Sequence, residues 1–177
     1  LSLPRATFRR ELLPRLHSAP KPKPQSAVLK NIVQINTKDI VGGAANLAYR
    51  IKNSLQEQGV RSTMLVDFKA SNDPAVDVIM RDNSLKQRIL KAGEIIHNYQ
   101  DFFHFSSFAL PQHPFFQEAD LVQLHNLHGG YFSLFALPEL TGRKPTVWTL
   151  QDMQALSGHC AHALDCVRWQ TGCGHCP

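Results

Sequence analysis

Short apolar runs alternate with helical patterns along most of the chain. The first run, residues 28–36, is apolar enough for a buried parallel strand, and similar runs cover residues 61–67, 120–126 and 145–150. Between the first two runs, apolar residues recur at helical spacing over residues 44–55. They are Ala44, Leu47, Ala48, Ile51 and Leu55, and the polar residues Arg50, Lys52, Asn53, Gln56 and Glu57 are expected on the other side of the helix. This alternation predicts an α/β fold, a Rossmann-like parallel sheet with helices on both faces.

The remaining segments are predicted to connect these strands. Polar residues 68–83 are expected to form a loop, and Ser84 begins a capping box for a helix that runs toward Tyr99. A short helix is predicted over residues 132–140, closed by Thr141 and Gly142. These connections place two further helices beside the predicted sheet.

Residues 102–116 contain six of the ten phenylalanines, interleaved with prolines. Prolines disfavour both helix interiors and central strands, so we expect an aromatic loop packed on the sheet. Such a loop serves either as an apolar plug or as one wall of a ligand pocket.

Positive charge is concentrated at the N-terminus. The formal net charge is +5, but residues 1–30 hold seven Lys or Arg residues and a single acid, Glu11. The rest of the chain is nearly balanced, which argues against a folded nucleic-acid-binding face. Residues 1–27, with a Pro-alternating run at 19–24, are predicted to form a disordered basic tail. No apolar run is long enough to span a bilayer.

All four cysteines lie in a Cys-rich segment, residues 159–177. They are Cys160, Cys166, Cys173 and Cys176. Disulfide-stapled secreted domains distribute their cysteines differently, so we expect a reducing cytosol. The close spacing of the last pair favours a structural zinc site, with disulfides or buried thiols as the alternatives. Four thiolates close the coordination shell, so a catalytic metal is not expected.

Polar residues gather where three of the predicted strands end. They are Asp39, Gly42 and Gly43 after the first strand, His125, Asn126 and His128 after the third, and Gln151 and Asp152 after the fourth. The carboxyl ends of parallel strands meet at one edge, where open α/β sheets bind ligands. Glycines at a strand-to-helix turn admit a phosphate to the helix N-terminus, although a plain tight turn uses the same residues. The dinucleotide fingerprint G-x-G-x-x-G is absent.

Several strings of this sequence resemble bacterial family 4 glycosyltransferases, closest to the colanic-acid type of cell-surface polysaccharide synthesis. They are D-I-V-G-G-A-A-N-L-A-Y-R-I, H-N-L-H-G-G-Y-F-S-L, V-W-T-L-Q-D-M-Q-A-L-S-G-H-C and W-Q-T-G-C-G-H-C-P. The resemblance covers residues 28–177 and implies a GT-B fold, in which two Rossmann-like domains face each other across a cleft. This chain is then expected to be the N-terminal, acceptor-side domain, apparently truncated before the domain that holds the nucleotide.

The resemblance also implies roles for the residues at the strand ends. Gly42 and Gly43 are expected to approach the donor phosphates. Asp39, His125, Asn126 and His128 are assigned to acceptor and sugar binding, and Gln151 and Asp152 to the catalytic position. The family string reads T-L-H-D-x-W, so Gln151 replaces a histidine and Gln154 a tryptophan.

The implied activity is that of a retaining glycosyltransferase that needs no metal for the transfer. It would move a sugar from a nucleotide-sugar donor to a saccharide or lipid-linked acceptor, in the cytoplasm or at the inner face of the membrane. We expect this fragment to be inactive by itself. The alternative is a non-catalytic saccharide-binding module or a zinc-stabilised structural module.

Overall fold

A five-stranded parallel sheet forms the centre of the molecule. The computed structural model describes residues 29–79, 101–157 and 160–171, together with Leu85, Ile89, Leu90 and Ala92. The strands are β1 (Asn31–Lys38), β2 (Arg61–Phe68), β3 (Val76–Val78), β4 (Leu121–Leu124) and β5 (Thr146–Trp148), in the order β3-β2-β1-β4-β5. The Rossmann-like α/β prediction is confirmed, whereas the predicted tail and most of the helix expected from Ser84 lie outside the described residues.

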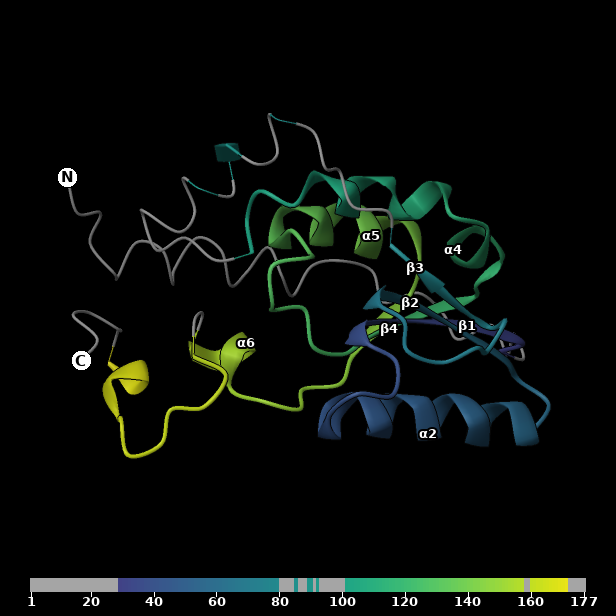
Figure 1. Cartoon of the computed structure of the whole chain (residues 1–177), viewed down its shortest axis with the longest axis horizontal. Coiled ribbons are helices and arrows are strands. Elements are labelled where there is room, and N and C mark those ends of the chain that lie inside the picture. Colours follow the sequence, from purple (N-terminus) through teal and green to yellow (C-terminus); the bar gives the residue numbers. More distant parts are fainter. Residues whose placement is uncertain are drawn as a thin grey trace, which may run out of the picture.

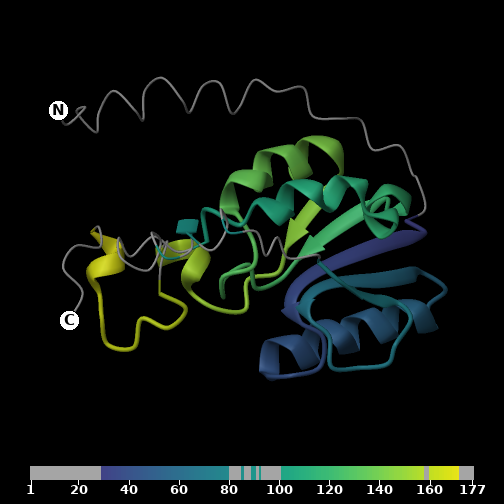
Figure 2. The same cartoon turned by 45° about the horizontal axis from the view of Figure 1, so that its top comes forward.

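Helices cover both faces of the sheet (Figure 1). The helix α2 (Gly43–Glu57) packs on one face beneath β1 and β2. The other face carries η1 (Phe105–Gln112), α4 (Pro114–Glu118), η2 (Leu134–Ala136) and α5 (Leu137–Arg143), as Figure 2 also shows. Two short elements, α6 (Gln154–Ser157) and η3 (Arg168–Gln170), lie beyond the carboxyl ends of the strands.

The helix α2 forms where the apolar spacing predicts it, but it buries a different set of residues. Lys52, expected on the polar side, is only 2% exposed, whereas Leu47, expected on the apolar side, is 47% exposed. The ammonium of Lys52 donates to Asp73 Oδ2 at 2.6 Å and lies 4.7 Å from the ring centroid of Tyr49. A buried lysine is stable only when its charge is paired, and Asp73 comes from the loop between β2 and β3.

The main hydrophobic core lies between the sheet and the layer of η1, α4 and α5. It joins Val33, Leu65 and Val122 of three strands to Phe116 and Leu140 of that layer. The segment 102–116 packs on the sheet as expected, but the prediction that it lacks regular structure is wrong. Proline is tolerated at a helix start because the first amide needs no partner; Pro114 begins α4 in this way.

Two other predictions are wrong in detail. Residues 68–83 were expected to be a loop, yet the three residues of β3 pair with β2 at the sheet edge. The helix predicted over residues 132–140 does not close at Gly142, because α5 continues to Arg143. Gly142 has a helical backbone in which a side chain would meet nothing within 4 Å.

Among the residues that the structure describes, no helix combines the length and the apolar character required to cross a lipid bilayer.

Candidate functional site

A cavity of about 410 Å³ opens at the carboxyl ends of β1 and β4. The chain leaves β1 through α2 toward β2 on one side, whereas β4 pairs with β1 on the other side. This reversal of strand order is the switch point where open α/β sheets bind ligands. The cavity, called the switch-point cavity below, is lined by residues 36–38, 41–45, Asn126, His128 and Gly129.

The glycine turn and the first turn of α2 form one wall of this cavity. Gly42 has a φ of 99°, a conformation that favours glycine, and its carbonyl accepts the amide of Asn46 at 3.0 Å. No side chain of the described residues caps the helix, and its first turn contains no acid. The free amides and the positive end of the helix dipole therefore face the cavity, which suits an anion such as phosphate.

The loop after β4 forms the opposite wall. Thr37 Oγ1 lies 3.2 Å from the carbonyl oxygen of Asn126 and 3.1 Å from that of His128. The amide of Asn126 donates to Asn36 Oδ1 at 3.3 Å, and Tyr131 Oη donates to the carbonyl of Asn126 at 2.7 Å. These bonds fix the backbone of the loop against the end of β1.

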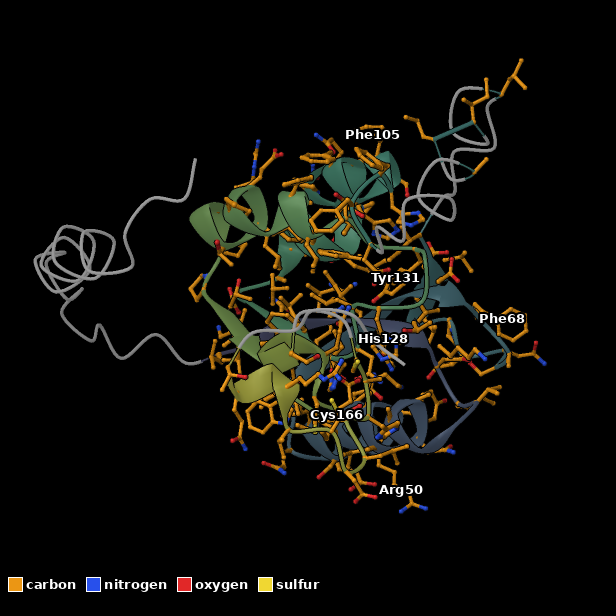
Figure 3. The ribbon with its side chains drawn as sticks, turned by 90° about the vertical axis from the view of Figure 1, so that its left-hand side faces the viewer. Arg50, Phe68, Phe105, His128, Tyr131 and Cys166 are labelled. Atoms are coloured by element: carbon orange, nitrogen blue, oxygen red, sulfur yellow. The ribbon has the colours of Figure 1, made fainter. Side chains whose placement is uncertain are left out.

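His128 is held by a carboxylate from the end of β5. Its Nε2 lies 2.8 Å from Asp152 Oδ2, and Asp152 Oδ1 accepts the amide of Gln154 at 2.9 Å. Figure 3, which looks onto the carboxyl ends of the strands, shows His128 in the middle of this face, between Phe105 and Arg50. A carboxylate that accepts from one ring nitrogen of a histidine orients the other nitrogen. The pair can thus donate to, or accept from, a hydroxyl in the cavity.

His125 lies below the cavity rather than in its wall. It is 1% exposed, and its Nε2 and Nδ1 lie 2.9 Å from the amide of Gln34 and 3.1 Å from that of Gln151. Burial lowers the pKa of His125 from 6.5 to about 4. The ring is therefore neutral near pH 7 and positions Gln151 rather than carrying charge.

Asp39 is completely buried and does not line the cavity. Its oxygens accept the amides of Ile40 at 2.9 Å, Ala70 at 2.9 Å and Ser71 at 2.8 Å. Burial raises the pKa of this carboxyl, but the hydrogen bonds outweigh burial and hold the pKa below its usual value. The carboxylate joins the turn after β1 to the turn after β2, so its geometry favours a structural role over the predicted sugar contact.

The structure describes only half of the predicted zinc ligands. Cys160 is partly buried and Cys166 is exposed, and the two are not joined in a disulfide. Within the described ranges, no group of three or more His, Cys, Asp or Glu residues is arranged to hold a metal ion. Cys173 and Cys176 lie outside those ranges, so the four-cysteine site stays a prediction.

The sequence patterns identify the glycine turn, Asn126, His128 and Asp152, and the structure brings these residues together. They miss Gln34 and Thr37, whose side chains connect the strands beneath and beside the cavity. A glutamine inside the apolar run of the first strand was the available signal for Gln34, since a buried amide needs partners.

Comparison with curated proteins finds a similarity to the putative colanic acid biosynthesis glycosyl transferase WcaC of Escherichia coli (strain K12). The two sequences are 26% identical over 162 residues, which cover 83% of this chain and 39% of that protein. The chain thus spans well under half the length of this relative. No protein-family model matches the chain, and no solved structure matches it significantly.

Proposed function

We propose that the chain is the acceptor-side domain of a glycosyltransferase, and that the switch-point cavity binds the phosphates of a nucleotide-sugar donor. The observation that carries this proposal is the uncapped N-terminus of α2 facing the His128–Asp152 pair across one cavity. The similarity to WcaC supports sugar transfer as the reaction class.

The two walls suit the two ends of such a donor. When the bond between the sugar and the diphosphate breaks, negative charge develops on the phosphate oxygen that leaves. Amides and the dipole of a helix N-terminus stabilise that charge, and they are already oriented before the reaction. On the other wall, His128 and the side-chain amide of Asn126 are available to hydrogen-bond sugar hydroxyls.

The proposal includes the finer expectations from the family resemblance. These are a GT-B enzyme with a second domain that grips the nucleotide, retention of the anomeric configuration, and a saccharide or lipid-linked acceptor. They also include a role in cell-surface polysaccharide synthesis at the cytoplasmic side of the membrane. The structural zinc site in residues 159–177 belongs to the same set of proposals.

A non-catalytic saccharide-binding module is the second candidate. It is favoured by Gln151, which stands where the family resemblance implies a histidine, because an amide does not titrate near neutral pH. Only a donor-binding domain needs an anion site at the start of α2. Anion binding therefore separates the two candidates.

The test is a titration with pyrophosphate, monitored by the backbone amide chemical shifts of the parent chain and of the Gly43→Asp variant. A Cβ at residue 43 meets nothing within 4 Å, so the position is open to a substitution that adds a carboxylate at the helix N-terminus. We expect pyrophosphate to shift the amides of residues 42–45, and Gly43→Asp to weaken binding about fivefold, equivalent to about 1 kcal/mol.

The matched control is Gly142→Asp, which adds the same charge at an open helical position in α5. This variant should bind pyrophosphate like the parent chain. Shifts confined to other segments, or equal affinity of the parent chain and Gly43→Asp, would rule out the anion site and leave the saccharide-binding module as the better reading.

A further inference from the structure

A row of three polar side chains lies beneath the switch-point cavity, and two of them, Gln34 and His125, are buried, whereas Gln151 is half-buried. Gln34 of β1 is completely buried and lies 2.9 Å from His125 Nε2, and His125 Nδ1 lies 3.1 Å from the amide of Gln151. The outer end of the Gln151 amide is also covered and has no hydrogen-bond partner among the described residues. The row thus runs from Gln34, a strand residue that faces α2, to Gln151, which follows β5 in the chain.

The orientation of the Gln34 amide is fixed by groups that cannot rotate. Its NH₂ end must lie 3.0 Å from the carbonyl oxygen of Ala48, and its oxygen 3.2 Å from the backbone N–H of Lys52. The opposite orientation would set oxygen against oxygen and N–H against N–H. In the favoured orientation the oxygen also accepts from Ser62 Oγ at 3.1 Å, and the NH₂ group donates to His125 Nε2 at 2.9 Å.

The orientation of the Gln34 amide determines the tautomer of His125 and, through it, the orientation of the Gln151 amide. If His125 Nε2 accepts a hydrogen bond, a neutral imidazole carries its proton on Nδ1. Nδ1–H then needs an acceptor, but the Gln151 atom that lies 3.1 Å from Nδ1 is Nε2. The amide of Gln151 must therefore rotate by half a turn, so that its oxygen accepts from Nδ1–H and its NH₂ group takes the outer place of Oε1. The outer, unpartnered end of Gln151 is consequently its NH₂ group.

We propose that Gln34 is a positioning residue that fixes the Nδ1–H tautomer of His125 and thereby turns Gln151 into a hydrogen-bond donor at the end of β5. The backbone of α2 sets the direction of these hydrogen bonds, because the carbonyl of Ala48 and the N–H of Lys52 both belong to that helix and fix the Gln34 amide. The ligand contact rests on the proposed function: Gln151 donates to an oxygen of the bound sugar. The direction of the hydrogen bonds from Gln34 through His125 to Gln151 does not depend on that function.

Scalar coupling across N–H···N hydrogen bonds tests the row in the chain labelled with ¹⁵N. We expect a coupling between Gln34 Nε2 and His125 Nε2, and ¹⁵N shifts that mark Nδ1 as the protonated ring nitrogen. A coupling between Gln151 Nε2 and His125 Nδ1, or an Nε2–H tautomer, overturns the proposal. Neither measurement depends on a ligand, so a failed pyrophosphate titration leaves this test intact.

Gln34→Met removes the donor while it conserves much of the volume. We expect the His125 ring to populate both tautomers, so that its two ¹⁵N shifts move toward each other. Gln123→Met is the matched control, because Gln123 pairs with Gln34 in register on β4 and donates instead to Thr149 Oγ1 at 2.9 Å. Unchanged His125 shifts in Gln34→Met overturn the proposal; if that variant does not fold, the couplings in the parent chain decide.

Discussion

His125 makes the folded state sensitive to mild acid. Burial holds its pKa at about 4, below the ordinary value of 6.5, so the unfolded chain takes up a proton at a pH where the native ring stays neutral. Stability is therefore full above pH 6.5 and falls as the pH drops from 6.5 to about 4. The loss approaches about 3 kcal/mol at the lower limit. Urea unfolding at several pH values across this window measures it.

His125→Asn is the control for this pH dependence. The variant lacks the titrating ring, so its free energy of unfolding should be lower at pH 7 but flatter between pH 6.5 and 4. The depressed pKa values of Asp39 and Asp73 affect stability only at lower pH, because both lie below 3.8. An equally steep decline in His125→Asn would show that other groups cause the acid sensitivity.

The contacts of single residues were predictable from sequence mainly where their partners are local. Gly42 and Gly43 are adjacent to the helix they begin, and both line the cavity, whereas their contact with donor phosphates stays a prediction. Lys52 was placed on the wrong side of its helix because its partner, Asp73, follows 21 positions later. The role of Gln34 depends on groups from α2, β2 and the loop after β4, which no local pattern brings together.

At the scale of an element, α2 ends in a motif that requires glycine. Gly59 has a φ of 81°, its amide donates to the carbonyl of Gln56 at 3.0 Å, and the amide of Val60 donates to that of Leu55 at 2.9 Å. These bonds satisfy carbonyls at the helix end. Gly59→Ala should lower the free energy of unfolding by about 1 kcal/mol through backbone strain alone, since a side chain there meets nothing within 4 Å.

Gly142→Ala separates this strain from the general effect of replacing glycine. Its backbone is already helical and the space around it is open, so alanine should raise stability by about 0.5 kcal/mol. Thermal and urea unfolding of both variants measure the two effects. If Gly59→Ala were as stable as the parent chain, the helix end would have to relax into a conformation without positive φ.

Elements were predictable to the extent that their apolar patterns are long. The strands β1 and β2, with eight residues each, and the 15-residue α2 were all identified. The three-residue β3 was missed because its Val-Asp-Val sequence has no pattern of its own and depends on pairing with β2. The prolines in segment 102–116 were read as breaking helices, whereas Pro114 starts one.

At the scale of the whole molecule, the candidate site depends on two segments that are far apart in sequence. The turn after β1 and the loop after β4 are brought together by pairing between β1 and β4. The predicted parallel sheet was sufficient to place these two segments at one edge. The patterns did not reveal which side chains hold the segments in contact, because those bonds run from side chain to backbone across about 90 positions.

Thr37 provides the test of this long-range connection. Thr37→Val keeps the shape of the side chain but removes the hydroxyl that lies beside the carbonyls of Asn126 and His128. The free energy of unfolding should fall by about 1 kcal/mol. We also expect pyrophosphate binding to weaken about threefold, because the wall formed by His128 and Gly129 is no longer held against β1. Calorimetric titration and urea unfolding measure the two effects.

Thr141→Val is the matched control, because Thr141 Oγ1 donates to the carbonyl of Leu137 at 2.9 Å within α5, far along the chain from the cavity residues. It makes the same kind of bond from hydroxyl to backbone, so it should share any general cost of the substitution while leaving affinity for pyrophosphate unchanged. If both variants bound pyrophosphate equally well, Thr37 would contribute to stability alone. The two walls of the cavity would then be held in place by the β1–β4 pairing without its help.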